Sequence, residues 1–225
     1  MSQEISAVKG QLIAASRILS REKLVRGFGH VSARIPGTKH FLLTPRVSLA
    51  LVKPKELLVM DLAGAVVAGR AEPPFEAALH AAIFRARPDV GAIARVHARR
   101  ASYFSVAGKR LEPVHNHGSY FHGGVPLFDK TPLISTAALG QEVAEALGKN
   151  PAVLLRGNGQ VTVGRTVPEA VMMAIYLEEA ADMLYGALQI GAPVFLRAEE
   201  SGLGKKETLP PVDMERAWNY YRNKK

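Results

Sequence analysis

The sequence predicts an α/β fold in which helices cover a largely antiparallel sheet. Short apolar runs with strand character alternate with longer stretches of helical periodicity. Tight turns join several of the strand-like runs, for example at Pro36-Gly37 and at Gly157-Asn158-Gly159. Hairpin connections of this kind make neighbouring strands antiparallel, and the interspersed helices then supply the covering layers.

The helical segments are marked by periodicity and by their ends. In residues 3–20 the apolar side chains form one stripe, and residues 75–87 follow Pro73-Pro74 and stop before Pro88. Further helices are expected over residues 98–106, 136–147 and 168–190. The third of these begins at a Thr166-Val167-Pro168-Glu169 capping box, and the second is capped by Ser135 or Thr136 and ends before Gly148.

The strand-like segments are short and apolar. They are expected over residues 31–35, 41–44, 57–60, 66–67, 90–97, 152–155 and 161–163. No linker or repeat divides the 225 residues, so we expect one domain over residues 1–225 with a C-terminal tail at about 205–225. The tail carries Trp218, Tyr220 and Tyr221 beside basic residues. It is expected to pack across a subunit boundary or on its own subunit.

Composition narrows the function classes. The formal net charge is +9, but the basic residues are scattered and no nucleic-acid-binding motif is present. This favours a small anionic substrate over nucleic acid. The absence of cysteine excludes disulfides and thiolate ligands. With no signal-like N-terminus and no apolar run of about 20 residues, a cytoplasmic protein without membrane contact is expected.

Candidate chemistry is concentrated in the middle of the chain, where five of the seven histidines lie between positions 80 and 122. Glu76 opens a helix, where the dipole would keep it ionised or where it could act as a general base. His97 closes a strand, and Arg99 would share its side of the chain if the strand continued through both. Such a pair can hold a carboxylate and move a proton.

Three further segments carry polar candidates. Asn158 lies between two glycines, which suits either a plain Asn-Gly hairpin turn or close approach of a ligand. The glycine-rich turn before His30 and Ser32 could bind an anion through its backbone N–H groups. Arg46, in Thr44-Pro45-Arg46, could bind an anionic group as well.

Taken in order, these segments resemble the class II aldolase/adducin family over about residues 7–200. The resemblance is carried by residues 29–34, 43–46, 61–64, 74–76 with His80, 87–90, 97–99 and 154–159. It implies an αβα sandwich with a mainly antiparallel central sheet. It also implies a homo-oligomer, commonly a four-fold tetramer with sites between subunits.

The resemblance also implies a metal, usually Zn²⁺, Mn²⁺, Co²⁺ or Fe²⁺. Its usual ligands are two histidines of a His-x-His segment and a third from an Arg-Gly-His-Gly or Arg-Asn-His-Gly turn, with a glutamate nearby. Here Glu76 and His97 match that pattern, whereas positions 99 and 158 hold Arg99 and Asn158. Arginine cannot ligate a metal and repels a dication, and the asparagine carbonyl oxygen suits hard ions better than zinc.

Two outcomes follow for the cofactor. Either the metal is lost, or His115, His117 or His122 supplies new ligands. We favour loss, because of the charge of the arginine. If a metal is held, His97 is the expected ligand, with Glu76 or Asn158.

The Gly-His-Val-Ser start, the Pro-Arg pair at 45–46 and the aromatic tail look more like the decarboxylase-type branch of the family. We therefore predict a C–C lyase that decarboxylates an aromatic or dienoic acid, with no need for a metal. Proposed catalytic residues are Glu76, His97, Arg99 and Asn158; proposed substrate-binding residues are His30, Ser32, Arg46, His115, His117 and Tyr120. The alternatives are a class II aldolase for a small carbonyl or sugar-phosphate compound, a metal-free isomerase or cyclase, and a non-catalytic adducin-like binding protein.

Overall fold

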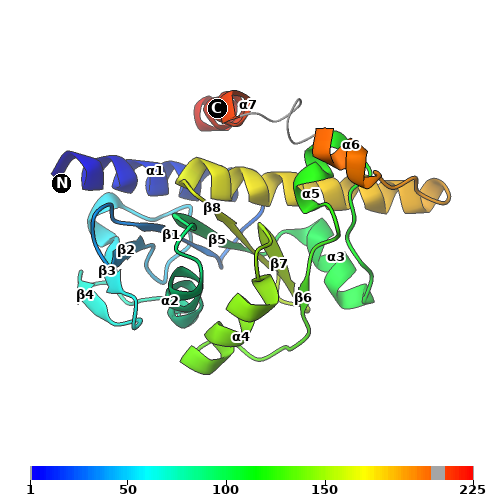
Figure 1. The fold of residues 1–225 in the computed structure, drawn as a ribbon. Helices are drawn as coiled ribbons and strands as arrows, with labels where there is room; N and C mark the ends of the chain where they lie inside the picture. The colour runs from blue at the N-terminus through cyan, green and yellow to red at the C-terminus, as the bar shows by residue number, and fades with distance from the viewer. Residues whose placement is uncertain (1, 204–210, 225) are drawn as a thin grey trace.

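The computed structural model describes residues 2–203 and 211–224, and an eight-stranded sheet lies at its centre (Figure 1). The strands are β1 (His30–Arg34), β2 (His40–Leu43), β3 (Leu58–Asp61), β4 (Val66–Ala68), β5 (Ala92–Val96), β6 (Leu127–Phe128), β7 (Ala152–Leu155) and β8 (Gln160–Gly164). Their order is β4-β3-β2-β1-β5-β8-β7-β6, and only the β6–β7 pair is parallel. The predicted α/β fold with a mainly antiparallel sheet is confirmed.

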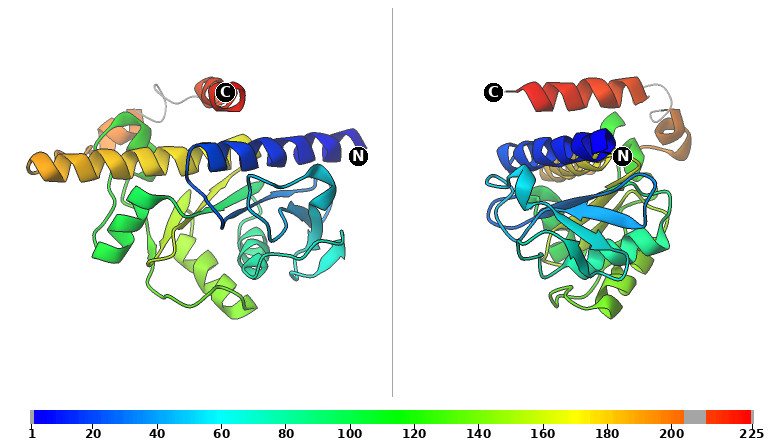
Figure 2. Two further views of the ribbon diagram at one scale, coloured as in Figure 1. Left: turned by 180° about the vertical axis from the view of Figure 1, so that it is seen from behind. Right: turned by 90° about the vertical axis from the view of Figure 1, so that its left-hand side faces the viewer.

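Helices cover both faces of this sheet. They are α1 (Ser2–Arg21), α2 (Ala77–Ala86), α3 (Arg99–Ala107), α4 (Ala137–Leu147), α5 (Val167–Ile190), α6 (Ala198–Leu203) and α7 (Pro211–Asn223), with short 3-10 turns η1 (Pro54–Glu56) and η2 (Asn116–Phe121). Helices α1 and α5 pack on one face and α2 and α4 on the other, while α7 lies on the outer side of α1 and α5 (Figures 1 and 2). No helix in the described ranges is both long and apolar enough to traverse a bilayer.

The predicted helix caps are present, with one change in partner. Thr166 accepts a hydrogen bond from the backbone N–H of Glu169 at the start of α5. The Glu169 carboxylate, however, accepts from the backbone N–H of Arg165 rather than from that of Thr166. At α4 the cap is Thr136, which accepts from the N–H of Leu139, and Gly148 follows the last turn.

The described part of the C-terminal tail packs on its own chain. Trp218 of α7 is only 5% exposed and belongs to the same hydrophobic cluster as the buried residues of α1 and α5. Tyr221 donates a hydrogen bond from its hydroxyl to Oε1 of Glu179 on α5. Of the two packing modes expected for the tail, the structure thus shows the intramolecular one, while residues 204–210 and 225 lie outside the described residues.

Candidate functional site

Three strand ends and one helix start meet at a single edge of the sheet. Strand β5 runs antiparallel to both β1 and β8, with Arg95 opposite His30 and Val96 opposite Gln160. The start of β1, the end of β5 and the β7–β8 turn are therefore adjacent. The N-terminus of α2 reaches the same edge. This topology brings His30, His97, Asn158 and Glu76 together.

These four side chains line a cavity of about 420 Å³. Arg46 also lines it. The opposite walls are largely apolar and are formed by Phe28, Pro45, Val47, Pro74, Phe75 and Leu133. Five of the residues predicted from the sequence thus face one concave space, which is where small-molecule sites are usually found.

Glu76 is the centre of the charge arrangement in this cavity. The residue is 5% exposed and takes the N-cap position of α2, but its side chain makes no cap hydrogen bond. Its Oε2 lies 3.1 Å from Nε of the fully buried Arg95, and Asn158 donates from Nδ2 to its Oε1 at 3.4 Å. Glu76 thus stands at the helix start as predicted, but its side chain bonds none of the free N–H groups there and forms a buried ion pair with Arg95 instead.

The neighbours of Glu76 keep it ionised. Burial alone would raise the pKa of this carboxyl, but the contact with His30 and the charge of Arg95 outweigh it and lower the pKa to about 2. The Nε2 of His30 lies 3.4 Å from Oε2 of Glu76. At neutral pH Glu76 is a fixed negative charge and not a proton donor.

A chain of short polar contacts extends from Glu76 into the core. Nδ1 of His30 lies 2.6 Å from Nε2 of His80, and Nδ1 of His80 lies 2.6 Å from Oγ of Ser32. A neutral His30 that donates from Nε2 to the Glu76 carboxylate can only accept a hydrogen bond at Nδ1. The donor to this Nδ1 is then Nε2 of His80. Nδ1 of His80 in turn accepts a hydrogen bond from the hydroxyl of Ser32. Burial lowers the pKa of both histidines, which keeps the rings neutral and allows this arrangement.

His97 follows the last residue of β5 and lines the cavity half-buried. Its backbone N–H donates to the carbonyl of Leu24, which fixes the chain at this point. Burial, followed by the positive charge of Arg95, lowers the pKa of His97 to about 4. The imidazole facing the cavity is neutral at pH 7.

Arg99 lies elsewhere than expected. Strand β5 ends at Val96 and α3 begins at Arg99, so the strand does not continue through positions 97 and 99. The expectation that both side chains share one side of a strand is wrong. Arg99 is exposed, stacks on Tyr103 with its Cζ 5.7 Å from the ring centre, and lines a neighbouring cavity that His97 also lines.

The other predicted binding residues fall into three places. Arg46 faces the cavity but is paired with the exposed carboxylate of Glu72, and its Cζ lies 4.3 Å from the ring centre of Phe75. Ser32 is fully buried behind His80. The predicted residues of the η2 region, His115, His117 and Tyr120, do not line this cavity. They pack near Tyr176 of α5 instead.

The cavity does not fit the metal that the family resemblance implies. Only one imidazole, that of His97, is available, and the Glu76 carboxylate is already held by Arg95 and His30. A dication at Glu76 would lie beside a buried guanidinium, which repels it. Among the described residues, a different group, His115, His117 and Glu179, could hold a metal ion.

The sequence-based prediction missed two central residues. Arg95 was overlooked, although a single charge inside the apolar run Ala92-Ile93-Ala94-Arg95-Val96 signals a buried partner. His80 stands among the segments that carry the family resemblance, but no role is predicted for it. Its pairing with His30 spans 50 residues of sequence and has no local signal.

Comparison with known proteins agrees with this architecture. Residues 10–185 match the model of the class II aldolase and adducin N-terminal domain. A 3,4-dihydroxyphthalate decarboxylase from Terrabacter sp. (strain DBF63) is 33% identical over 201 residues, which cover 83% of this chain and 82% of the relative.

Aldolases are similar as well. A 5-methylthioribulose-1-phosphate/5-deoxyribulose-1-phosphate aldolase from Rhodospirillum rubrum is 29% identical over 196 residues, 86% of this chain and 87% of the relative. The solved structure of L-fuculose 1-phosphate aldolase from Glaciozyma antarctica PI12 superposes with a TM-score of 0.84 at 26% identity, covering 98% of this chain and 88% of that one. The chain therefore belongs to the class II aldolase and adducin family.

Proposed function

We propose that this chain is a carbon–carbon lyase that decarboxylates a small hydroxylated aromatic acid, with no metal in the Glu76 cavity. The observation that carries the proposal is a neutral His97 beside the fixed negative charge of Glu76, in a cavity with apolar walls. The similarity to 3,4-dihydroxyphthalate decarboxylases supports the substrate class.

The walls of the cavity suit a flat ring. Phe28 and Phe75 both line it and are 80% and 62% exposed, and the Arg46 guanidinium lies over the ring of Phe75. Aromatic side chains bind rings by stacked or edge-to-face contacts at low entropic cost. Leu133 and two prolines extend the apolar wall.

A second, cationic cavity adjoins the first. It shares Phe28 and His97 with the Glu76 cavity and is also lined by Lys23, Arg26 and Arg99. In the described part of the chain, none of these three cations forms an ion pair with an acidic side chain. Cations in this neighbouring cavity favour a substrate that carries a second carboxylate, placed on the side of the ring away from Glu76.

The proposed step is a proton shuttle by His97. The imidazole accepts the proton of a ring hydroxyl, and the electron pair left on oxygen moves into the ring. The carbon that bears the reacting carboxylate takes up the proton from His97. The bond to the carboxylate then breaks, its electron pair restores the aromatic ring, and CO₂ leaves. Solvent returns one proton to the hydroxyl oxygen, so the balance is substrate plus one proton to product plus CO₂.

The other residues support this shuttle. The negative charge of Glu76 offsets part of the effect of burial and of Arg95, both of which disfavour the imidazolium that forms on His97. Asn158, oriented by its hydrogen bond to Glu76, can hydrogen-bond the ring hydroxyl. A low pKa makes the imidazolium a strong acid, which favours delivery of the proton to carbon.

A substrate panel tests the proposal. The purified protein would be incubated with 3,4-dihydroxyphthalate, related hydroxybenzoates and sugar phosphates, with CO₂ measured in the headspace and products identified by NMR. We expect CO₂ and a ring that has lost one carboxylate. Aldehyde release from a sugar phosphate would instead support the aldolase alternative, and a product of unchanged mass would support an isomerase or cyclase. Binding without turnover would support an adducin-like role.

A further inference from the structure

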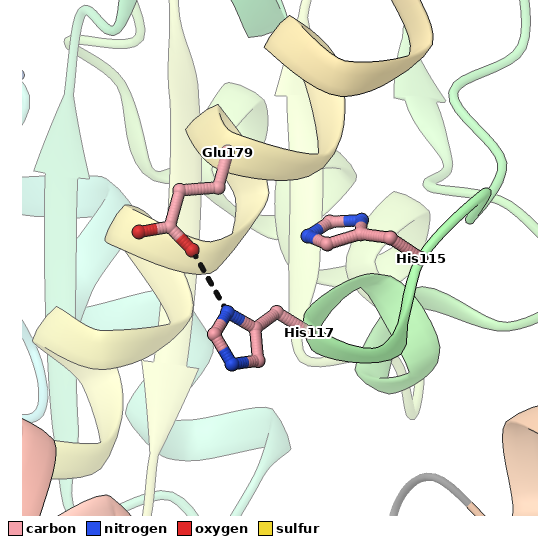
Figure 3. A group of neighbouring side chains, drawn as sticks. All are labelled: His115, His117 and Glu179. Atoms are coloured by element: carbon pink, nitrogen blue, oxygen red, sulfur yellow. Dashed lines mark hydrogen bonds and ion pairs between the residues drawn. The ribbon is translucent and has the colours of Figure 1, made fainter.

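Outside the catalytic cavity, two histidines and a glutamate gather between η2 and α5. Figure 3 shows the rings of His115 and His117 and the carboxylate of Glu179 facing a common space. One potential ligand atom from each residue lies within 4.8 Å of the others, and Nδ1 of His117 is 3.1 Å from Oε2 of Glu179. None of the three lines the Glu76 cavity.

The three side chains are held in place from different directions. The second carboxylate oxygen of Glu179 accepts a hydrogen bond from the hydroxyl of Tyr221 on α7 at 3.3 Å. The ring of His117 packs against that of Tyr176 with the ring centres 4.9 Å apart. Partners that orient ligands in this way are typical of metal sites, because they reduce the cost of assembling the donor atoms.

His115 completes the group, and its ring is only partly satisfied within the protein. Its Nδ1 is buried and has no hydrogen-bond partner among the described residues. A buried ring nitrogen without a partner costs free energy. An ion bound by the other ring nitrogen would add a contact that holds this ring in place.

The donor set and its surroundings indicate the kind of ion. Two imidazoles and one carboxylate with a position left open suit Zn²⁺ and Co²⁺ better than the oxygen-preferring Mg²⁺ or Ca²⁺. A cavity of about 360 Å³ opens beside His117 and Glu179, which leaves room for a water ligand. Among the described residues, Arg216 is the one Lys or Arg that lines it; its Nη1 lies 3.8 Å from Oδ1 of Asp213, and its side chain is 86% exposed.

We propose that His115, His117 and Glu179 form a divalent metal site of the Zn²⁺ or Co²⁺ type, separate from the catalytic cavity. The bound ion would connect η2 to α5 and, through Tyr221, to α7. An ion that binds only the folded chain stabilises it by mass action. The proposal does not depend on the proposed decarboxylation, because metal binding is measured without any substrate.

Metal titration of chelator-treated protein tests the site. We expect one equivalent of Co²⁺ to produce a visible absorption spectrum of four- or five-coordinate ions, and Zn²⁺ to displace it and raise the melting temperature. His117→Ala and Glu179→Gln should each weaken Zn²⁺ binding at least tenfold in calorimetry. Tyr221→Phe should weaken it less. His122→Ala, an exposed histidine in the same segment, should leave binding unchanged.

Two results would overturn the proposal. One is the absence of stoichiometric binding by the wild-type chain. The other is binding that survives in both His117→Ala and Glu179→Gln but is lost in His97→Ala, which would place the ion in the Glu76 cavity. Circular dichroism of each variant confirms that it is folded. Glu179→Gln keeps the shape of the side chain and remains informative if His117→Ala unfolds.

Discussion

His97 carries the proposed chemistry at the level of single residues. In the part of the chain that the structure describes, it is the one imidazole that lines both the Glu76 cavity and the cationic cavity. Replacing it with glutamine should lower kcat by about 100-fold or more, the usual contribution of a general acid–base group. Steady-state kinetics with the substrate found in the panel would measure this. His122→Gln is the matched control, and a His97→Gln variant with near wild-type kcat would remove His97 from the mechanism.

The pH dependence of the reaction reports the same residue. His97 is active when neutral, and its pKa is lowered to about 4. The value of kcat/KM should therefore stay level on acidification through pH 6.5 and fall only near pH 4. In the unfolded chain His97 would protonate near pH 6.5, so folding stability drops between about pH 6.5 and 4. Circular dichroism at each pH separates the two effects. An acid limb at pH 6.5 in folded protein would contradict the assignment.

The Arg95–Glu76 pair should be costly to break from one side. Both side chains are buried, and Arg95→Met would leave the carboxylate without its cation. Removing one partner of a buried pair typically costs about 3–5 kcal/mol of unfolding free energy. Urea denaturation would measure the loss, and Arg95→Met with Glu76→Gln should recover part of it. As a control, Arg197→Met at the exposed pair with Glu200 should change stability by about 0.5 kcal/mol or less. Equal effects at both sites would contradict the buried pair.

At the scale of elements, the β7–β8 turn positions Asn158 by close backbone contact. Gly157 and Gly159 both have positive φ, at 66° and 75°. A Cβ at Gly159 would lie 2.2 Å from the carbonyl oxygen of Val96, whereas one at Gly157 would meet only Cγ1 of Val106 at 3.7 Å. The plain-turn explanation therefore holds at both glycines. The close neighbour of Gly159 is the backbone at the end of β5, and the approach of a ligand to this turn stays a prediction.

A pair of alanine variants separates these two effects. Gly157→Ala should cost only the strain of the left-handed conformation, about 1–2 kcal/mol. Gly159→Ala carries the same strain and must also displace the end of β5, so we expect a larger loss of stability and weaker substrate binding. Thermal denaturation and KM would show the difference. Equal effects of the two variants would mean that the turn does not press on β5.

Elements with local signals were predictable, and those fixed by distant contacts were not. The periodicity of residues 3–20 and the threonine caps locate α1, α4 and α5, because caps and stripes are encoded within a few residues. Strand β6 has two residues and exists only through its pairing with β7. The end of β5 was placed one residue late at His97, and this error produced the wrong expectation for Arg99.

The same distinction holds for the site. Glu76, His97, His30 and Asn158 were found because each stands in a short motif, and the topology does bring them to one cavity. The partners that set their charge states, Arg95 and His80, act across the sheet and were missed. The chemistry of a residue was predictable from its motif, whereas its pKa depends on neighbours that only the fold supplies.

At the scale of the whole molecule, exposed apolar side chains near and beyond the end of α5 favour self-association. They are Met183, Leu188, Ile190, Val194 and Phe195, with Ile190 92% exposed. Where such side chains form a contiguous patch, they mark an interaction site. We propose the homotetramer expected from the family resemblance and predict a sedimentation mass of four times the 24.3 kDa chain. Ile190→Asp should reduce that mass, while Val67→Asp, on the exposed strand β4, should not. A monomer at micromolar concentration would contradict the proposal.

The Glu76 cavity is proposed to work without the metal usual in this family, and metal depletion separates this proposal from metal-dependent catalysis. Protein stripped of metal, with its content verified by elemental analysis, would be assayed for CO₂ release from 3,4-dihydroxyphthalate. The same assay would be run on the His117→Ala variant, in which the proposed separate metal site is removed. We expect the depleted wild-type chain and the depleted variant both to keep turnover within about twofold of their untreated forms. Turnover that disappears on depletion and returns with added metal in His117→Ala would show a metal in the catalytic cavity, and decarboxylation without a metal would then be wrong.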